Sequence, residues 1–368
     1  MTRPFEQDKL TQIESASVTM PEGGSQIEKC MKAIHSDNVA TESEKNDASA
    51  VCSPRVVALI PCYNPRRFIR ETVESLLQQT RKVDLIVVMD DGSTDGFESE
   101  IQDLVETHDN LIIHHNPRNL GVSSTRNIGF ENYAADFYIL NDADDISLPD
   151  RVERTILFMQ AHPNCGIVGG FVEYINSQGK VFGKGTQIDC ITEEDSRRYR
   201  ESMKPLGLFT PTVCLRGRML RETGLRFDEK LSMSEDIDLW NRVLESGWDV
   251  LAIPDFLSQY RFHGNSVCTS RFVYCKKSFL FVKENLRRRR SGKNLLTYDE
   301  YEDSIRRLGG IARLKYMYPI YAEYLYRTGG YNVVDAHPLR GVIMLLGSFL
   351  MQPWRVWRII RQRFGLRS

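Results

Sequence analysis

Four short apolar runs, separated by stretches with helical spacing, constrain the fold of this chain more than any other feature. Each run is rich in β-branched residues and too short for a buried helix, so each predicts a buried strand. Strands that alternate with helices in this order predict a parallel sheet with right-handed crossovers. The runs are RVVALIP (55–61), DLIVVMD (84–90), LIIHH (111–115) and DFYIL (136–140).

Polar segments follow three of these strands. In an open parallel sheet, ligands bind at the carboxyl ends of the strands. We therefore expect the three segments to converge in space, although they are far apart in the sequence. We also expect Asn64 and Pro65 to cap and open the helix after the first strand. The segments are PCYN (61–64), DDGSTD (90–95) and NDADD (141–145).

The flanking regions differ from this core in composition. Residues 1–53 contain one aromatic residue and many polar ones, which predicts a disordered extension. A single α/β domain is expected over 54–268, with a further strand at 165–175 and a helix at 234–247 capped by Ser234. Residues 269–368 are expected to form a helical, basic C-terminal extension.

Bulk charge and cysteine usage limit the class of protein. The formal net charge of -1 favours no binding to nucleic acid. The eight cysteines are scattered without a CxxC pair, a pattern typical of free thiols in a reducing cytoplasm. We therefore expect a cytoplasmic protein.

The C-terminus carries a local charge signal. From Arg340 onward there are six arginines and no acidic residue, and tryptophan and isoleucine alternate with them at roughly helical spacing. This pattern indicates a segment, 340–368, that lies peripherally on an anionic membrane surface at the inner face of the cytoplasmic membrane. A C-terminal helix packed on the domain with a solvated basic face fits the same residues equally well.

Three clustered carboxylates in NDADD, those of Asp142, Asp144 and Asp145, predict a bound cation. Such a cluster at a strand end is costly unless a cation is bound or the cluster stays well solvated, and we favour the cation. Oxygen ligands without a nearby His or Cys pair favour Mn²⁺ or Mg²⁺ over zinc, and phosphate oxygens typically complete such a shell. Farther along, Ser147 and Asp150 fit a capping box for the next helix. Asp145 stays unassigned between a supporting group and a solvated turn residue.

Four ordered motifs, taken together, resemble the family 2 glycosyltransferases with a GT-A fold. The resemblance covers about residues 55–265 and implies a mainly parallel central sheet flanked by helices. It also implies a nucleotide-sugar donor held by the first half of the sheet. The motifs are ALIPCYNPRRFIRETVESLLQQT, VVMDDGSTDG, NLGVSSTRNIGF and YILNDADDISLPDR.

Positions in these motifs carry the expected donor contacts. By the resemblance, Pro61 and Tyr63 line the base pocket and Asp91 contacts the base, usually uracil. Arg126 lies near the nucleotide or its diphosphate. Asp142 contacts the ribose or the metal, and Asp144 is the stronger metal ligand.

The second half supplies the expected catalytic base. The family's base is the aspartate of a Glu-Asp pair that opens a helix, matched here by Asp236, with Asp238 as a nearby competitor. One direct displacement on the sugar inverts its anomeric configuration. The segment YRFHGNS (260–266) resembles the part that closes over the diphosphate, so Arg261 could touch phosphate and His263 could be a further metal ligand.

The resemblance thus implies an inverting glycosyltransferase. The expected donor is a UDP-sugar. The expected acceptor is a hydroxyl of a glycan or lipid-linked saccharide in cell-envelope polysaccharide or lipopolysaccharide synthesis. No GxGxxG follows the first strand, which argues against a nicotinamide dehydrogenase. The alternative from another class is a catalytically silent sugar-nucleotide-binding homologue that acts as a scaffold in envelope assembly.

Overall fold

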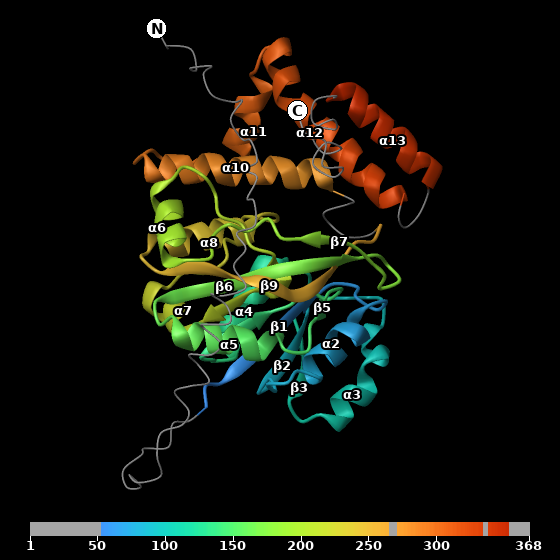
Figure 1. The fold of residues 1–368 in the computed structure, drawn as a ribbon, viewed down its shortest axis with the longest axis vertical. Helices are drawn as coiled ribbons and strands as arrows, with labels where there is room; N and C mark the ends of the chain where they lie inside the picture. Colours follow the sequence, from blue (N-terminus) through green and yellow to red (C-terminus); the bar gives the residue numbers. More distant parts are fainter. Residues whose placement is uncertain (1–52, 265–270, 334–337, 353–368) are drawn as a thin grey trace, which may run out of the picture. The chain divides into compact units, whose positions relative to one another are not determined.

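The computed structural model describes residues 53–264, 271–333 and 338–352 (Figure 1). From Pro54 onward the described residues belong to one compact unit. Residues 1–52 lie outside them, so the disordered N-terminal extension stays a prediction. The arginine- and tryptophan-rich segment after residue 352 also lies outside the described residues.

The first half of the sheet is parallel, as the alternation of apolar runs predicts. The strands stand in the order β3-β2-β1-β4, and every neighbouring pair among them is parallel. The elements are β1 (Val56–Cys62), α2 (Ile69–Leu77), β2 (Leu85–Asp90), η1 (Phe97–Glu100), α3 (Gln102–Thr107), β3 (Leu111–His115), α4 (Val122–Asn132) and β4 (Phe137–Leu140).

The second half of the sheet is mixed. β8 pairs antiparallel with both β4 and β6, whereas β6 and β9 run parallel. β9 begins with the apolar run DVLAIP (249–254) and continues to Arg261 at the edge of the site. The elements are β5 (Ile146–Ser147), α5 (Arg151–Ala161), β6 (Cys165–Ile175), β7 (Val181–Gly185), α6 (Glu193–Glu201), η2 (Thr210–Thr212), β8 (Cys214–Arg216), α7 (Gly217–Thr223), α8 (Glu235–Glu245) and β9 (Asp249–Arg261).

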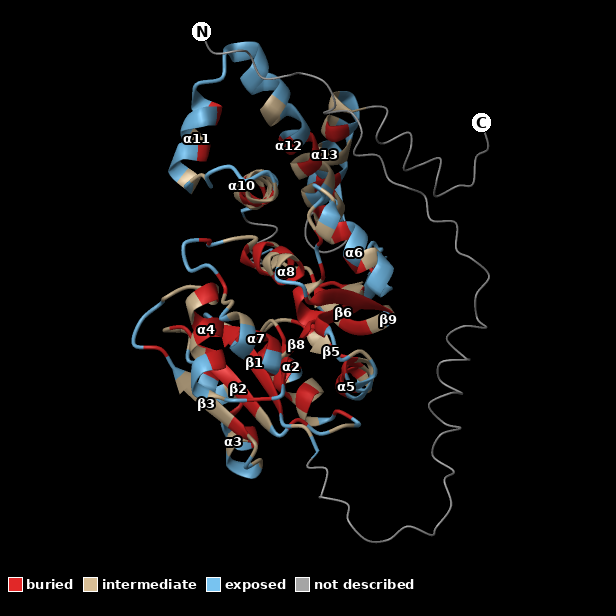
Figure 2. Ribbon diagram, turned by 90° about the vertical axis from the view of Figure 1, so that its left-hand side faces the viewer, coloured by how far each residue is buried: buried red, intermediate tan, exposed pale blue. Residues whose placement is uncertain are grey.

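Both faces of the sheet are covered, which explains why β1 is apolar throughout rather than alternating. Leu59 packs into the core on one face with Phe130 of α4 and Leu239 of α8. Its neighbour Ile60 packs into the core on the other face with Ile69 of α2. Figure 2 shows the central strands as predominantly buried.

The predicted caps of two helices are wrong. α2 begins at Ile69, not at Pro65, because Asn64 adopts a left-handed conformation with a φ of 53°. α5 begins at Arg151 and makes no side-chain cap hydrogen bond. Ser147 instead lies in β5, where its hydroxyl accepts a 2.8 Å hydrogen bond from the buried Arg151 guanidinium. Ser147 is therefore a hydrogen-bond partner of this buried cation and not part of a capping box.

The region after residue 270 is helical, as expected. α10 contacts α8 through ion pairs from Arg289 and Arg290 to Glu245. Among the described helices, none combines the length and apolar character that crossing a bilayer requires. The cysteines in the described ranges form no disulfide. The helices are α10 (Phe272–Arg290), α11 (Tyr298–Arg306), α12 (Gly310–Tyr331) and α13 (Pro338–Met351).

Candidate active site

The segments after β1 and β2 meet at the carboxyl edge of the sheet. The Asn64 amide donates to Ser93 Oγ at 2.9 Å, and the Thr94 amide donates to Asn64 Oδ1 at 2.8 Å. These bonds account for the left-handed conformation of Asn64, because its side chain binds the turn after β2 and does not cap α2. The convergence of these two segments is therefore confirmed.

The expected base pocket is built on Asp91. Its carboxylate accepts hydrogen bonds from the Leu120 and Gly121 amides, each at 2.8 Å, and from Asn116 Nδ2 at 2.9 Å. This carboxylate thus holds the loop before α4 against the end of β2. Of the two other residues expected here, Pro61 is buried at the end of β1 and Tyr63 is 55% exposed.

Gly92 allows this close approach of the two loops. Its φ is +77°, a conformation that residues with a Cβ rarely adopt. A Cβ at this position would lie 2.9 Å from the Asn119 backbone nitrogen and 3.0 Å from the Arg118 carbonyl carbon. The glycine in DDGSTD is therefore required by both conformation and space.

Arg126 joins the two halves of the candidate site. Its guanidinium, 4% exposed, donates to Asp142 Oδ1 at 2.9 Å and to Glu235 Oε1 at 2.8 Å. It also lies over the Phe227 ring at 5.1 Å. Asp142 follows β4 and Glu235 opens α8, so one cation fixes the two acidic motifs beside each other. The sequence reasoning expected Arg126 near the nucleotide and missed this bridge.

Asp142 and Glu235 are held beside the Arg126 guanidinium, and the pKa values of both carboxyls are raised. Burial raises the pKa of Glu235 to about 7, with a further contribution from Asp236 and an opposing one from Arg126. Burial also raises the pKa of Asp142, against the effect of Arg126 and together with Asp144 and Asp236. Two carboxylates thus share one guanidinium, an arrangement that an additional cation would stabilise.

Asp144 and His263 are brought together, as the metal prediction requires. Asp144 Oδ2 lies 2.8 Å from His263 Nε2, although the two residues are 119 positions apart. Both side chains are partly exposed at the site. Asp142 is instead turned to Arg126.

Arg261 is not free in this structure. It is buried and extends its guanidinium over the Phe68 ring at 4.6 Å, with an ion pair to Glu71 Oε2 at 2.5 Å. Its Nε donates to the Asp144 carbonyl at 2.8 Å, and its amide donates to Asp145 Oδ1 at 2.7 Å. Arg261 thus fixes the NDADD segment through these two hydrogen bonds.

Asp145 takes a supporting position. Burial and the neighbouring Asp144 and Asp142 raise the pKa of its carboxyl well above the ordinary value. Its Oδ2 is buried and has no hydrogen-bond partner in the described part of the chain. Of the nearby groups, the Asp144 carboxylate and the adjacent His263 imidazole are donors that suit Mn²⁺ or Mg²⁺.

Asp236, the expected base, is held by two neutral donors, of which one is the Ile237 amide at 2.7 Å from Oδ1. Thr210 Oγ1 donates to Asp236 Oδ2 at 2.8 Å. Its competitor Asp238 is buried and forms ion pairs with Arg242 at 2.6 Å and Arg289 at 3.5 Å. A carboxylate occupied by two arginines is a poor base, so the geometry favours Asp236 over Asp238.

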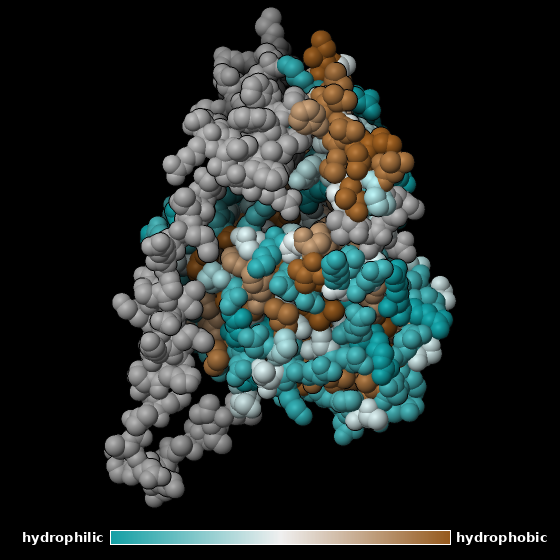
Figure 3. All heavy atoms as spheres, turned by 45° about the vertical axis from the view of Figure 1, so that its right-hand side comes forward, coloured by the Kyte–Doolittle hydropathy of each residue, from teal (hydrophilic) through white to brown (hydrophobic). Residues whose placement is uncertain are grey.

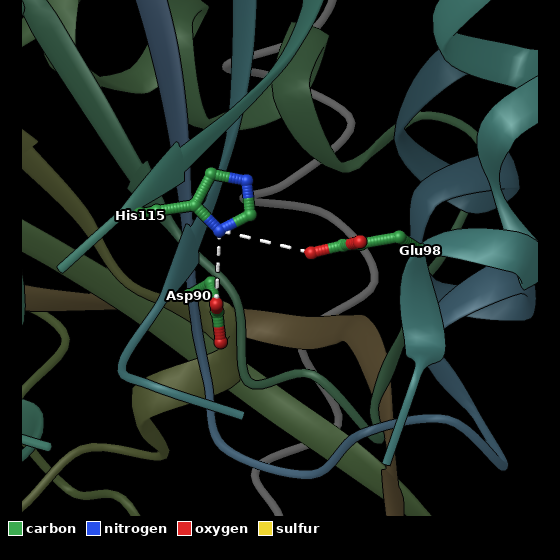
Figure 4. A group of neighbouring side chains, drawn as sticks. All are labelled: Asp90, Glu98 and His115. Atoms are coloured by element: carbon green, nitrogen blue, oxygen red, sulfur yellow. Dashed lines mark hydrogen bonds and ion pairs between the residues drawn. The ribbon is translucent and has the colours of Figure 1, made fainter. Parts of the chain in front are cut away.

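A second group of metal-ligand type residues lies at the ends of β2 and β3 (Figure 4). His115 Nδ1 faces Asp90 Oδ2 at 3.0 Å and Glu98 Oε1 at 3.8 Å. One ligand atom from each residue lies within 4.8 Å of the others. The parallel register of Asp90 with His115 follows from the strand order, but the position of Glu98 depends on the turn between them and could not be predicted.

Comparisons with known proteins agree with this architecture. The model of the family described as Glycosyl transferase family 2 matches residues 57–224. An uncharacterized glycosyltransferase of Methanocaldococcus jannaschii is 27% identical over 210 residues, covering 56% of this chain and 71% of the relative. A putative teichuronic acid biosynthesis glycosyltransferase of Bacillus subtilis is 26% identical over 233 residues, covering 63% of this chain and 88% of the relative.

A solved structure shows the same fold over most of the chain. The mannosyltransferase of Pyrobaculum calidifontis, in complex with GDP-Man and Mn²⁺, superposes with a TM-score of 0.52 at 15% identity, covering 90% of this chain and 91% of that one. The expectation of an α/β GT-A fold with C-terminal helices is thereby confirmed. With the family model and the relatives in agreement, residues 57–224 of this chain form a family 2 glycosyltransferase domain.

Proposed function

We propose that this enzyme moves a sugar from a nucleotide-sugar donor to a hydroxyl of a glycan or lipid-linked acceptor in cell-envelope polysaccharide or lipopolysaccharide synthesis, with inversion. The observation that carries the proposal is the Arg126 bridge. It holds Asp142 of the donor side against Glu235 of the catalytic side, and Asp236 follows Glu235 directly. Donor and base residues therefore belong to one site.

The proposed donor is UDP-sugar. Asp91 occupies the position that usually contacts uracil in the enzymes this chain resembles, with Pro61 and Tyr63 beside it. The solved neighbour binds GDP-Man, so guanosine donors belong in the same test. The relative named for teichuronic acid biosynthesis supports an acceptor in a cell-envelope polysaccharide.

Asp142, Asp144 and His263 would hold Mn²⁺ or Mg²⁺, with Arg261 packed behind them. Bound there, the ion would offset the negative charge that develops on the leaving diphosphate. Asp236 acts as general base and takes the proton of the acceptor hydroxyl. The Thr210 hydroxyl and the Ile237 amide keep this carboxylate in place. Attack from the face opposite the diphosphate inverts the anomeric configuration.

The test is a panel of UDP-sugars and GDP-mannose, with and without Mn²⁺, in which nucleotide binding and donor turnover are measured separately. Wild type is compared with Asp144→Asn and Asp236→Asn. Asp150→Asn is the matched control, because Asp150 carries the same side chain at the start of α5, half exposed and paired only with Arg154.

Asp144→Asn is expected to lose Mn²⁺-dependent binding, and Asp236→Asn to bind donor normally but lose turnover. Asp150→Asn should behave as wild type. Nucleotide binding that needs no metal and is unchanged in Asp144→Asn would overturn the metal assignment. Normal donor binding without turnover against any acceptor, in wild type and Asp236→Asn alike, would support the scaffold alternative instead.

A further inference from the structure

The outer side of α13 is apolar along its whole length. The exposed face of this helix, which we call the α13 face, repeats at three- and four-residue spacing, so its side chains lie along one stripe. Leu339 and Leu350 near its two ends are 80% and 79% exposed. Figure 3 shows an apolar surface running over this part of the molecule. The apolar residues of the face are Leu339, Val342, Ile343, Leu346, Phe349 and Leu350.

The inner side of α13 explains why its large residues point outward. α13 packs on α12 through small residues: a Cβ on Gly341 would lie 2.7 Å from the Gly329 carbonyl oxygen, and Ser348 Oγ donates to the Ala322 carbonyl at 2.8 Å. Close packing through glycine, alanine and serine is the way helices associate in lipid, where large side chains face the hydrocarbon.

The α12 helix extends this apolar character. Ile311 and Leu314 in its first turns are exposed, and six tyrosines occur between residues 316 and 331. Tyrosine is enriched where protein meets the boundary between hydrocarbon and headgroups. Glu323, the one acidic residue of α12, is buried and paired with Lys276 and Arg327.

The positive charge of the sequence from residue 338 onward favours an anionic partner. From residue 338 to 368 the sequence contains six arginines and no acidic residue. The 14 residues of α13 span about 21 Å, less than the roughly 30 Å of a hydrocarbon core. A helix of this kind lies in the plane of the interface, with its apolar stripe among the acyl chains.

We propose that the α13 face docks on an anionic lipid bilayer. A protein partner would need about one hydrogen bond per 100–200 Å² of interface. Among the described residues of α13, Arg340 is the one exposed residue with a hydrogen-bonding side chain, so the face suits hydrocarbon better than protein. The proposal concerns a surface apart from the active site and does not depend on the donor or acceptor.

The test is flotation of the full-length chain with vesicles of phosphatidylcholine alone and of phosphatidylcholine mixed with phosphatidylglycerol. The variant Ile343→Ser/Leu346→Ser replaces two residues of the α13 face. Its control, Leu157→Ser/Leu295→Ser, replaces two other large aliphatic residues, 47% and 51% exposed, in α5 and in the loop before α11. Circular dichroism and nucleotide binding verify that each variant is folded.

Wild type and control are expected to float with the anionic vesicles and less with the neutral ones. The α13 variant should lose at least about tenfold in partition coefficient, because two apolar side chains no longer enter the lipid. Equal partitioning of all three proteins, or no flotation of wild type, would overturn the proposal. A dimer in light scattering that the α13 variant abolishes, without vesicle binding, would assign the face to a second copy and overturn it equally.

Discussion

Replacing Arg126 by alanine should destabilise the protein in a way that depends on pH. The substitution removes a 4% exposed guanidinium that holds two carboxylates at 2.8 and 2.9 Å. Charge-assisted hydrogen bonds contribute about 1.5–3 kcal/mol each, and removing one partner of a buried ion pair costs about 3–5 kcal/mol. We therefore expect a loss of about 3–5 kcal/mol in the free energy of unfolding near pH 8.

The loss should shrink in acid because Glu235 can then take up a proton. The folded-state pKa of Glu235 is raised to about 7, above its ordinary value of 4.5, so between these values the folded state binds more protons than the unfolded state. Stability from this group therefore falls as the pH rises through about 7. Without Arg126 the carboxylate is ionised alone, so the difference between variant and wild type should be largest at alkaline pH.

The assay is urea unfolding of wild type and Arg126→Ala at about pH 5.5 and about pH 8. Arg66→Ala is the control, because Arg66 is 56% exposed and forms a surface pair with Glu100 at 3.0 Å. Such a pair contributes about 0–1 kcal/mol. A loss for Arg126→Ala below about 1 kcal/mol at pH 8, or an equal loss at both pH values, would refute the bridging role.

Two further outcomes follow from the packing and from the candidate base. Gly217→Ala should lower the free energy of unfolding by about 3 kcal/mol or more, since a Cβ there would lie 2.0 Å from the Ala135 carbonyl oxygen. Gly310→Ala, with no atom within 4 Å of the new Cβ, should change it by less than about 1 kcal/mol, and equal melting shifts for the two variants would contradict this. Thr210→Val should lower kcat about tenfold with little change in donor affinity, because it removes one of the two hydrogen bonds that place Asp236. An unchanged kcat in steady-state assays would count against Asp236 as the base.

The pattern of apolar residues could predict the strands that are buried on both faces of the sheet and the helices that bury one face. β1, and β2 as far as Met89, are apolar because they are buried on both faces, and this pattern predicts their places along the chain. The helix from Glu235 to Glu245 shows a clear apolar stripe, and its start was predicted to within one residue. The length of β9 was not predicted, because polar residues such as Asp255, Ser258 and Gln259 interrupt the apolar pattern in its second half. Pairing with β6 nevertheless continues beyond these residues.

The site could be predicted as a set of residues but not as a set of contacts. Asp142 and Asp144 stand out as carboxylates at a strand end, and the motifs select Asp236. The bridging of Arg126 to Glu235 is a contact between residues 109 positions apart, and nothing in either local pattern indicates it. Likewise, the ion pair of Arg261 with Glu71 joins residues 190 positions apart, which a motif search reads as two unrelated surface charges.

These long separations have a consequence for the order in which the enzyme becomes active. The segment that the family model matches ends at residue 224, before Glu235 and His263. During synthesis, the donor half of the sheet emerges from the ribosome with Asp142 and Asp144 in place but with neither Glu235 nor His263. Contacts so distant in sequence form late, after the loop between them closes. Under the proposed function, metal-dependent nucleotide binding would therefore mark completed folding, and a nascent or truncated chain with an intact first half would lack it.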